Sequence, residues 1–124
     1  MARLAPKAAL TLALVASSVL LAACGTGGAV SQAKLACVYV HRSLEIQQQS
    51  EAANLSSSRR VALENRAIAE MVRATPFAAR ATSMDGSWNP LMTTIGEAQR
   101  VPIPDFAASL SRLCRVANSK TPYL

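Results

Sequence analysis

The first 23 residues have the pattern of an export signal. A short basic segment that ends at Lys7 is followed by an apolar run over 8–21, which small residues close at Ala22 and Ala23. This run is too short to predict a membrane span. Without it, 101 residues remain, which is enough for one small domain and excludes a multidomain enzyme. These residues carry 11 basic and 7 acidic side chains, so the formal net charge falls from +6 to +4.

The end of this signal, Leu21-Ala22-Ala23-Cys24, matches the lipobox of bacterial lipoproteins, and residues 1–25 are similar to that family. The resemblance implies cleavage by signal peptidase II between Ala23 and Cys24 and attachment of diacylglycerol to the Cys24 thiol. It also implies a lipid-anchored protein on the extracytoplasmic face of the cell membrane, since two acyl chains hold stably where one is marginal. The alternative is an ordinary secretory signal with a cysteine near its cleavage site. We expect 24–30, which is rich in glycine, to be a flexible tether.

Cys37 and Cys114 are the two cysteines that remain once Cys24 carries lipid. An even pair in an exported chain favours a disulfide. That bond closes a loop for which the chain-entropy estimate is about 4.5 kcal/mol. A metal site in which His41 joins both cysteines is the alternative. The sequence has no second histidine and no Cys-x-x-Cys pair, so we predict the disulfide, no metal and no cofactor.

Helices are expected throughout the remaining chain, because proline and glycine fall between long stretches of Ala, Leu, Arg, Glu and Gln. No segment shows the alternation of a strand. We predict an all-α small four-helix bundle over 31–118, closed by one disulfide, in which the first and fourth helices are neighbours. The C-terminus over 119–124 is expected to fray. The four predicted helices run over 31–53, 58–74, 76–98 and 104–117.

Several helix ends have recognisable signals. Ser31 is placed to cap the first helix, and Thr75-Pro76 predicts a restart between the second and third. The third helix should be kinked or split near Gly86, with Ser87 capping a new start and Pro90 in the first turn, where no backbone donor is needed. The inward stripe of the second helix is predicted as Val61, Ile68, Met71 and Val72.

Four arginines recur at intervals of seven, and the first three lie on one side of the predicted second helix about 10.5 Å apart. Such a row could contact anionic lipid headgroups, where each arginine contributes about 1 kcal/mol. The alternative is a solvated face with ion pairs at helical spacing, namely Arg60/Glu64, Arg66/Glu70 and Glu70/Arg73. The row consists of Arg59, Arg66 and Arg73, continued by Arg80.

Catalysis finds little support in the sequence. His41 is the only candidate base, no Gly-x-Ser-x-Gly turn is present, and the seven acidic residues are scattered. We therefore predict that the protein is not an enzyme. The motif Asp85-Gly86-x-Trp88-x-x-Leu91 and the Ala/Arg-rich composition resemble small lipoproteins of high-GC actinobacteria, which implies no activity.

The prediction that remains is a membrane-anchored, non-catalytic binding or accessory module at the cell envelope, with a protein partner there and no nucleic acid. An interaction module predicts an exposed apolar patch around Trp88, Leu91 and Met92. The first alternative is a carrier of a small ligand or lipid in an apolar cavity between helices. The second is a reader of anionic membranes through the arginine row.

Overall fold

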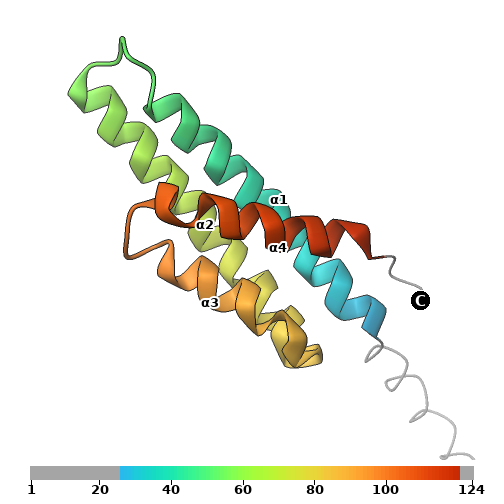
Figure 1. Cartoon of the computed structure of the whole chain (residues 1–124). Coiled ribbons are helices and arrows are strands. Elements are labelled where there is room, and N and C mark those ends of the chain that lie inside the picture. The colour runs from blue at the N-terminus through green and yellow to red at the C-terminus, as the bar shows by residue number, and fades with distance from the viewer. Residues whose placement is uncertain (1–25, 121–124) are drawn as a thin grey trace, which may run out of the picture.

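The computed structural model describes residues 26–120, and every regular element in that range is helical (Figure 1). The predicted all-α class with four α-helices is confirmed for these residues. In chain order, the elements are α1 (Thr26–Ser50), α2 (Ser57–Met84), the 3-10 turn η2 (Gly86–Trp88), α3 (Asn89–Glu97), the 3-10 turn η3 (Ile103–Phe106) and α4 (Ala107–Ser119).

The two long helices α1 and α2 form an antiparallel pair joined by a short loop (Figure 1). Ser56 closes this loop as the N-cap of α2, where its hydroxyl accepts a 3.3 Å hydrogen bond from the Arg59 backbone N–H. The shorter helices continue the fold: α3 contacts α2, α4 contacts α1, and α3 and α4 contact each other. They therefore lie over one side of the α1–α2 pair.

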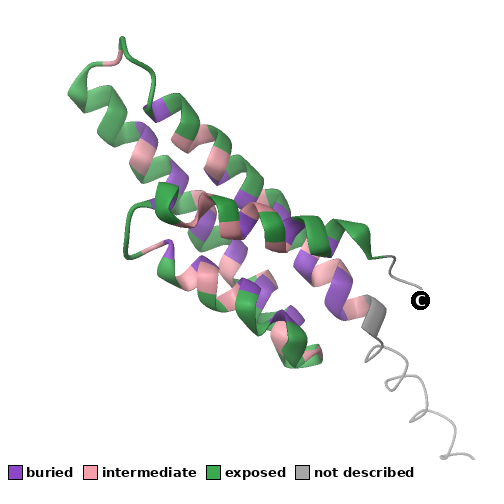
Figure 2. Ribbon diagram, in the orientation of Figure 1, coloured by how far each residue is buried: buried purple, intermediate pink, exposed green. Residues whose placement is uncertain are grey.

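Small side chains form the contact between α1 and α2. Buried positions recur along each helix at alternating spacings of three and four, and most are alanine (Figure 2). Because alanine has little bulk, the two backbones can approach closely. The buried positions of this contact are Ala29, Ala33, Ala36, Val40 and Ser43 on α1 and Ala67, Met71, Ala74, Ala78 and Ala81 on α2.

The predicted inward stripe of the second helix is right for one residue and wrong for three. Met71 is fully buried, whereas Val61, Ile68 and Val72 are 52%, 37% and 50% exposed. The larger aliphatic side chains were expected inside because burying them removes more apolar area from water. The close approach of two helices instead selects alanine for the buried face and leaves these three on the surface.

The predicted restart at Thr75-Pro76 is also wrong, because α2 continues through Pro76 without a break. Proline in a helix interior removes one backbone hydrogen bond and costs about 3 kcal/mol. The buried alanines on both sides, Ala74 and Ala78, keep the same face against α1. Continuous packing along this face outweighs the lost bond.

The predicted split near Gly86 is confirmed, although its cap differs. The helix ends before Asp85, η2 follows, and α3 begins with Pro90 in its first turn as expected. The Asp85 carboxylate, and not the Ser87 hydroxyl, closes this break by accepting a 2.9 Å hydrogen bond from the Ser87 backbone N–H. This bond lowers the pKa of the Asp85 carboxyl below its ordinary value of 3.8.

The predicted tether is wrong for residues 26–30, which are the first residues of α1. Ser31 consequently lies inside the helix and does not cap it. Ala29 is fully buried and Val30 is 7% exposed, and their packing offsets the poor helix propensity of the glycines before them. The signal, cleavage and lipidation predictions for residues 1–25 lie outside the described residues, as does 121–124 of the end that was expected to fray; Ser119 of that end is the last residue of α4.

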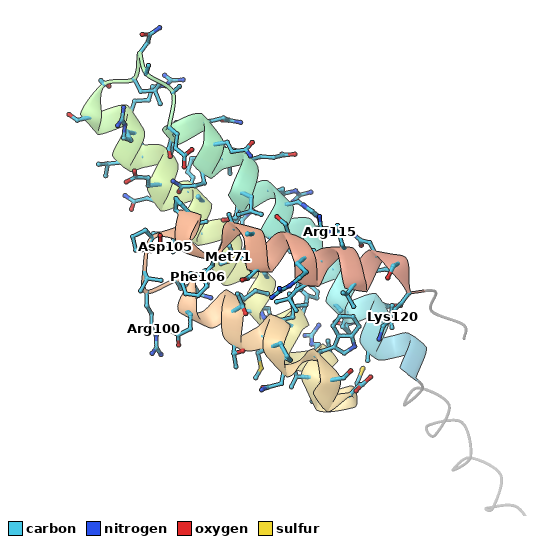
Figure 3. The ribbon with its side chains drawn as sticks, viewed as in Figure 1. Met71, Arg100, Asp105, Phe106, Arg115 and Lys120 are labelled. Carbon is cyan, nitrogen blue, oxygen red and sulfur yellow. A yellow bond between two sulfur atoms is a disulfide. The ribbon has the colours of Figure 1, made fainter. Side chains whose placement is uncertain are left out.

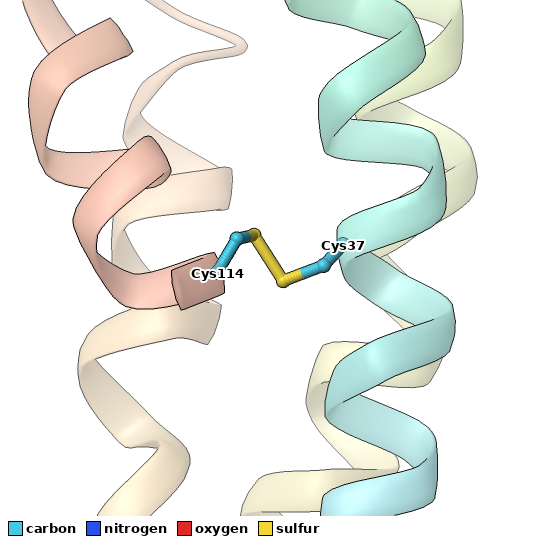
Figure 4. Close-up of a disulfide and its surroundings, with 2 residues drawn as sticks. All are labelled: Cys37 and Cys114. Carbon is cyan, nitrogen blue, oxygen red and sulfur yellow. A yellow bond between two sulfur atoms is a disulfide. The ribbon is translucent and has the colours of Figure 1, made fainter. Parts of the chain in front are cut away.

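The predicted disulfide joins α1 to α4 (Figure 4). The Cα atoms of Cys37 and Cys114 are 5.5 Å apart, and both residues are buried. Because the bond occupies both sulfur atoms, it excludes the alternative in which the cysteines bind a metal with His41. It also encloses most of the described chain in one covalent loop.

Candidate functional site

A surface groove of about 480 Å³ lies where the C-terminal end of α1 and the first half of α2 meet the segment between α3 and α4. Sequence reasoning missed it, since its walls come from distant parts of the chain. The groove is lined by Gln47 and Glu51, by Glu64 and Ile68, and by the run from Gln99 to Pro104.

The segment that forms one wall of the groove is held at several points. The Gln99 side-chain amide donates a 2.8 Å hydrogen bond to the Thr75 hydroxyl of α2. Beyond it, the Arg100 backbone N–H donates to the Glu97 carbonyl at 2.9 Å. Ile103 is only 3% exposed and belongs to the core. These contacts hold the wall against α2, so the groove is preformed.

The groove combines charged and apolar side chains. Glu51 and Glu64 supply two carboxylates, and Arg100 lies at its outer edge, on the linker that leads to Asp105 and Phe106 (Figure 3). None of these three forms a salt bridge within residues 26–120. Ile68 and the linker prolines supply the apolar part. A preformed concave surface of this size with a few polar groups is typical of sites that bind small molecules or peptide segments.

The arginine row lies on α2 as predicted, with Arg59, Arg66 and Arg73 all exposed. Of the ion pairs expected for a solvated face, the structure forms the one between Arg73 and Glu70, at 2.9 Å. The pairs Arg60/Glu64 and Arg66/Glu70 are not formed among the described residues.

Two aromatic rings lie beside this row. Tyr39 of α1 stacks on Phe77 of α2 with ring centroids 5.6 Å apart. The Arg42 guanidinium lies 5.4 Å from the Tyr39 ring centroid, and that of Arg80 lies 5.7 Å from the Phe77 centroid. Both rings are half-buried and pack against the core. We call this surface the basic face; it consists of Tyr39, Arg42, Arg59, Arg66, Arg73, Phe77 and Arg80.

The exposed apolar patch that an interaction module would need around Trp88 is not present among residues 26–120. Trp88 is 4% exposed, Leu91 is fully buried, and Met92 is half-buried. The break at Asp85 turns Trp88 inward, and the Lys120 ammonium lies 5.2 Å from the ring centroid (Figure 3). These side chains therefore stabilise the fold and do not form an exposed binding surface.

The remaining candidate from the sequence, His41, is exposed on α1. No group of three or more His, Cys, Asp and Glu side chains within residues 26–120 is placed to hold a metal ion. In the same part of the chain, no helix is both long and apolar enough to cross a membrane.

Comparison with protein-family models, with curated proteins and with solved structures finds no match to this chain.

Proposed function

We propose that this protein is a lipoprotein of the cell envelope, cut before Cys24 and held by lipid on that residue at the extracytoplasmic face of the membrane. Its domain is a non-catalytic binding or accessory module. The lipobox supports the anchor. The buried disulfide between Cys37 and Cys114 supports export, because disulfides persist in oxidising compartments.

The arrangement of the helices suits a rigid module of this kind. We propose that the four helices form a small bundle, since α1 contacts α2 and α4 while α3 contacts α2 and α4. The disulfide fastens the last helix to the first. A bundle fixed in this way presents its surfaces in constant geometry close to the membrane.

The groove between α1, α2 and the 99–104 linker carries the binding role. Its charged side chains, Glu51, Glu64 and Arg100, favour a peptide segment of an envelope protein over an acyl chain. The carrier that was the alternative requires an apolar cavity between helices, whereas this groove is a surface feature with charged walls. We therefore favour a protein partner.

The anchor is tested by expressing the full chain in a bacterium that processes lipoproteins. We expect the protein in the membrane fraction, with a mature N-terminus at Cys24 whose mass includes diacylglycerol. The Cys24→Ala variant should lose the lipid and the processing. An unmodified Cys24 in the mature wild-type protein contradicts the proposal.

The groove is tested with a photo-crosslinking amino acid placed at Ile68 in the anchored protein. Val116 on α4 is a matched control position, since it is 44% exposed and Ile68 is 37% exposed. We expect an adduct with one envelope protein from position 68 in intact cells and none from position 116. The Glu64→Lys variant should weaken the adduct by reversing one charge of the groove. Identical products from both positions contradict a role for the groove.

A further inference from the structure

We propose that the basic face docks on the anionic phospholipid bilayer in which the protein is anchored, so that the α1–α2 pair lies along the membrane. The proposal rests on the proposed anchor at Cys24 and specifies how the domain is oriented above it. Three features of the structure carry it: the direction in which the face points, its charge, and its position relative to the anchor.

The basic face points away from the other helices. On α1, Cys37 faces α4 through the disulfide, and Tyr39 follows two residues later. Because successive residues of a helix are about 100° apart, Tyr39 points about 160° away from Cys37. This side of the pair is therefore free of α4.

The same spacing applies on α2. Thr75 faces the start of the linker that follows α3, through its bond to Gln99, and Arg73 and Phe77 lie two residues to either side of it. Both side chains therefore point about 160° away from the side that this linker covers. The basic face thus has no other helix of residues 26–120 in front of it.

The charge of this face is strongly positive. It carries five arginines. The acidic side chains near them are Glu70, which is 16% exposed and paired with Arg73, and Glu45, which is exposed three residues after Arg42 on α1. The other carboxylates named above, Glu51 and Glu64, line the groove on the opposite side of the pair. The chain therefore separates its charges so that the arginines can meet a negative surface together.

Apolar side chains accompany the arginines at the end nearest the anchor. Leu35 and Met84 are 43% and 47% exposed, and they flank the stacked Tyr39 and Phe77 rings in helical register. Tyrosine, whose ring has a polar edge, is typical of the interface between headgroups and acyl chains, and Tyr39 is such a residue. The guanidinium groups over the two rings can reach phosphate while the rings contact the interface.

The start of α1 brings this face close to the bilayer. Thr26 is the first helical residue and stands two positions after Cys24. Two residues span at most about 7 Å of extended chain. The antiparallel arrangement places the end of α2, with Met84, beside the start of α1. The domain is therefore held against the headgroups at the end that carries the exposed apolar side chains.

The test measures how fast each arginine of the anchored protein reacts with phenylglyoxal. The purified lipoprotein is inserted into the outer leaflet of preformed vesicles of phosphatidylcholine, alone or mixed with phosphatidylglycerol, and modification is quantified by mass spectrometry of peptides. We expect Arg66, Arg73 and Arg80 to react several-fold more slowly on the anionic vesicles. The exposed residues Arg112 and Arg115 on α4 should react equally on both. High salt should remove the difference, because it screens exposed charges.

A variant with Arg66→Gln and Arg73→Gln tests the cooperation of the face. Arg42 and Arg80 should lose their protection in this variant, and they should keep it in a control with Arg112→Gln and Arg115→Gln. The proposal is overturned if the arginines of the basic face react at equal rates on neutral and anionic vesicles. It is also overturned if a soluble polyanion protects these arginines and anionic vesicles do not. Absence of lipid on Cys24 would instead overturn the proposed anchor, and it is detected separately by the intact mass.

Discussion

The Ser43 hydroxyl of α1 donates a 2.6 Å hydrogen bond to the backbone carbonyl of Ala67 on α2. Ser43 is fully buried, as is Ala67. A serine side chain is short, so this bond forms only where two helix backbones run close together. It lies at the end of the alanine-rich contact that is nearer to the loop between α1 and α2.

Replacing Ser43 tests this contact. Ser43→Ala should lower the free energy of unfolding by about 1 kcal/mol through the lost hydrogen bond. Ser43→Val should cost about 1–3 kcal/mol, because a larger side chain forces the helices apart. Urea unfolding monitored by circular dichroism measures both. Ser50→Ala is the control: its hydroxyl bonds to Gln47 within α1, so its loss should not change the distance between helices. A Ser43→Val protein as stable as wild type contradicts the close approach.

Removing the disulfide should be the most destabilising change. The Cys37→Ala/Cys114→Ala variant loses a covalent loop, for which the chain-entropy estimate is about 4.5 kcal/mol. For a domain of this size, that is comparable with the whole free energy of unfolding. Denaturant unfolding with and without reductant gives the measurement: reductant should destabilise the wild type and leave the variant unchanged. An intact mass that does not rise by about two daltons on reduction of the wild type contradicts the bond.

Truncation at two adjacent positions on α2 should change the free energy of unfolding by very different amounts. Met71 is fully buried, whereas Val72 is half exposed. Met71→Ala should cost about 2–5 kcal/mol by leaving a cavity. Val72→Ala should change stability by no more than about 0.5 kcal/mol. Thermal unfolding of the two variants compares them directly, and a larger loss for Val72→Ala would indicate a different register of α2.

Pro76 should be a destabilising residue. It cannot donate a backbone hydrogen bond inside α2. Pro76→Ala restores this donor at an exposed position and should stabilise the protein by about 1–3 kcal/mol. Pro90, in the first turn of α3, is the matched control, since no helical donor is needed there. Stabilisation of equal size in Pro90→Ala would show that α2 does not depend on the missing bond.

The Asp85 cap should make stability depend on acid. The Ser87 backbone and side-chain hydrogen bonds lower the pKa of the folded carboxyl below 3.8. The unfolded chain therefore binds the proton more readily, and the stability that the carboxylate contributes is present above pH 3.8 and lost as the pH falls through the folded pKa. Asp85→Ala should lower the melting temperature at neutral pH. Below the folded pKa, the difference from wild type should shrink, and a constant difference at all pH values contradicts the cap.

The helix break and the disulfide were predictable because their signals are local or covalent. Asp85-Gly86 and Pro90 restrict the backbone wherever they occur. Cys37 and Cys114 can form a disulfide under oxidising conditions whatever the register in which the helices pack. The prediction of a helix restart at Pro76 was wrong because proline locally disfavours the continuation of a helix. Only the packing of α2 against α1 outweighs this local preference.

The candidate sites also divide into features that were predictable from a local signal and features that depend on the packing of helices. The interval from Arg59 to Arg73 predicts an arginine row on one side of a helix, and the structure has all three residues exposed on α2. The aromatic pair that joins it required knowledge of which side of α1 meets α2. The groove was not predictable, since Glu51, Ile68 and Pro102 meet only in the folded chain.

The sequence by itself determined the helical class, the break near Gly86, the cysteine pairing and the side on which the arginines lie. These follow from backbone restrictions, covalent chemistry and helical periodicity, which act within one element or one bond. Tertiary structure decided that alanines and not Val61 and Val72 form the core, and that α1 begins at Thr26. Each of these depends on how closely two helices approach, and that distance is a property of both surfaces together.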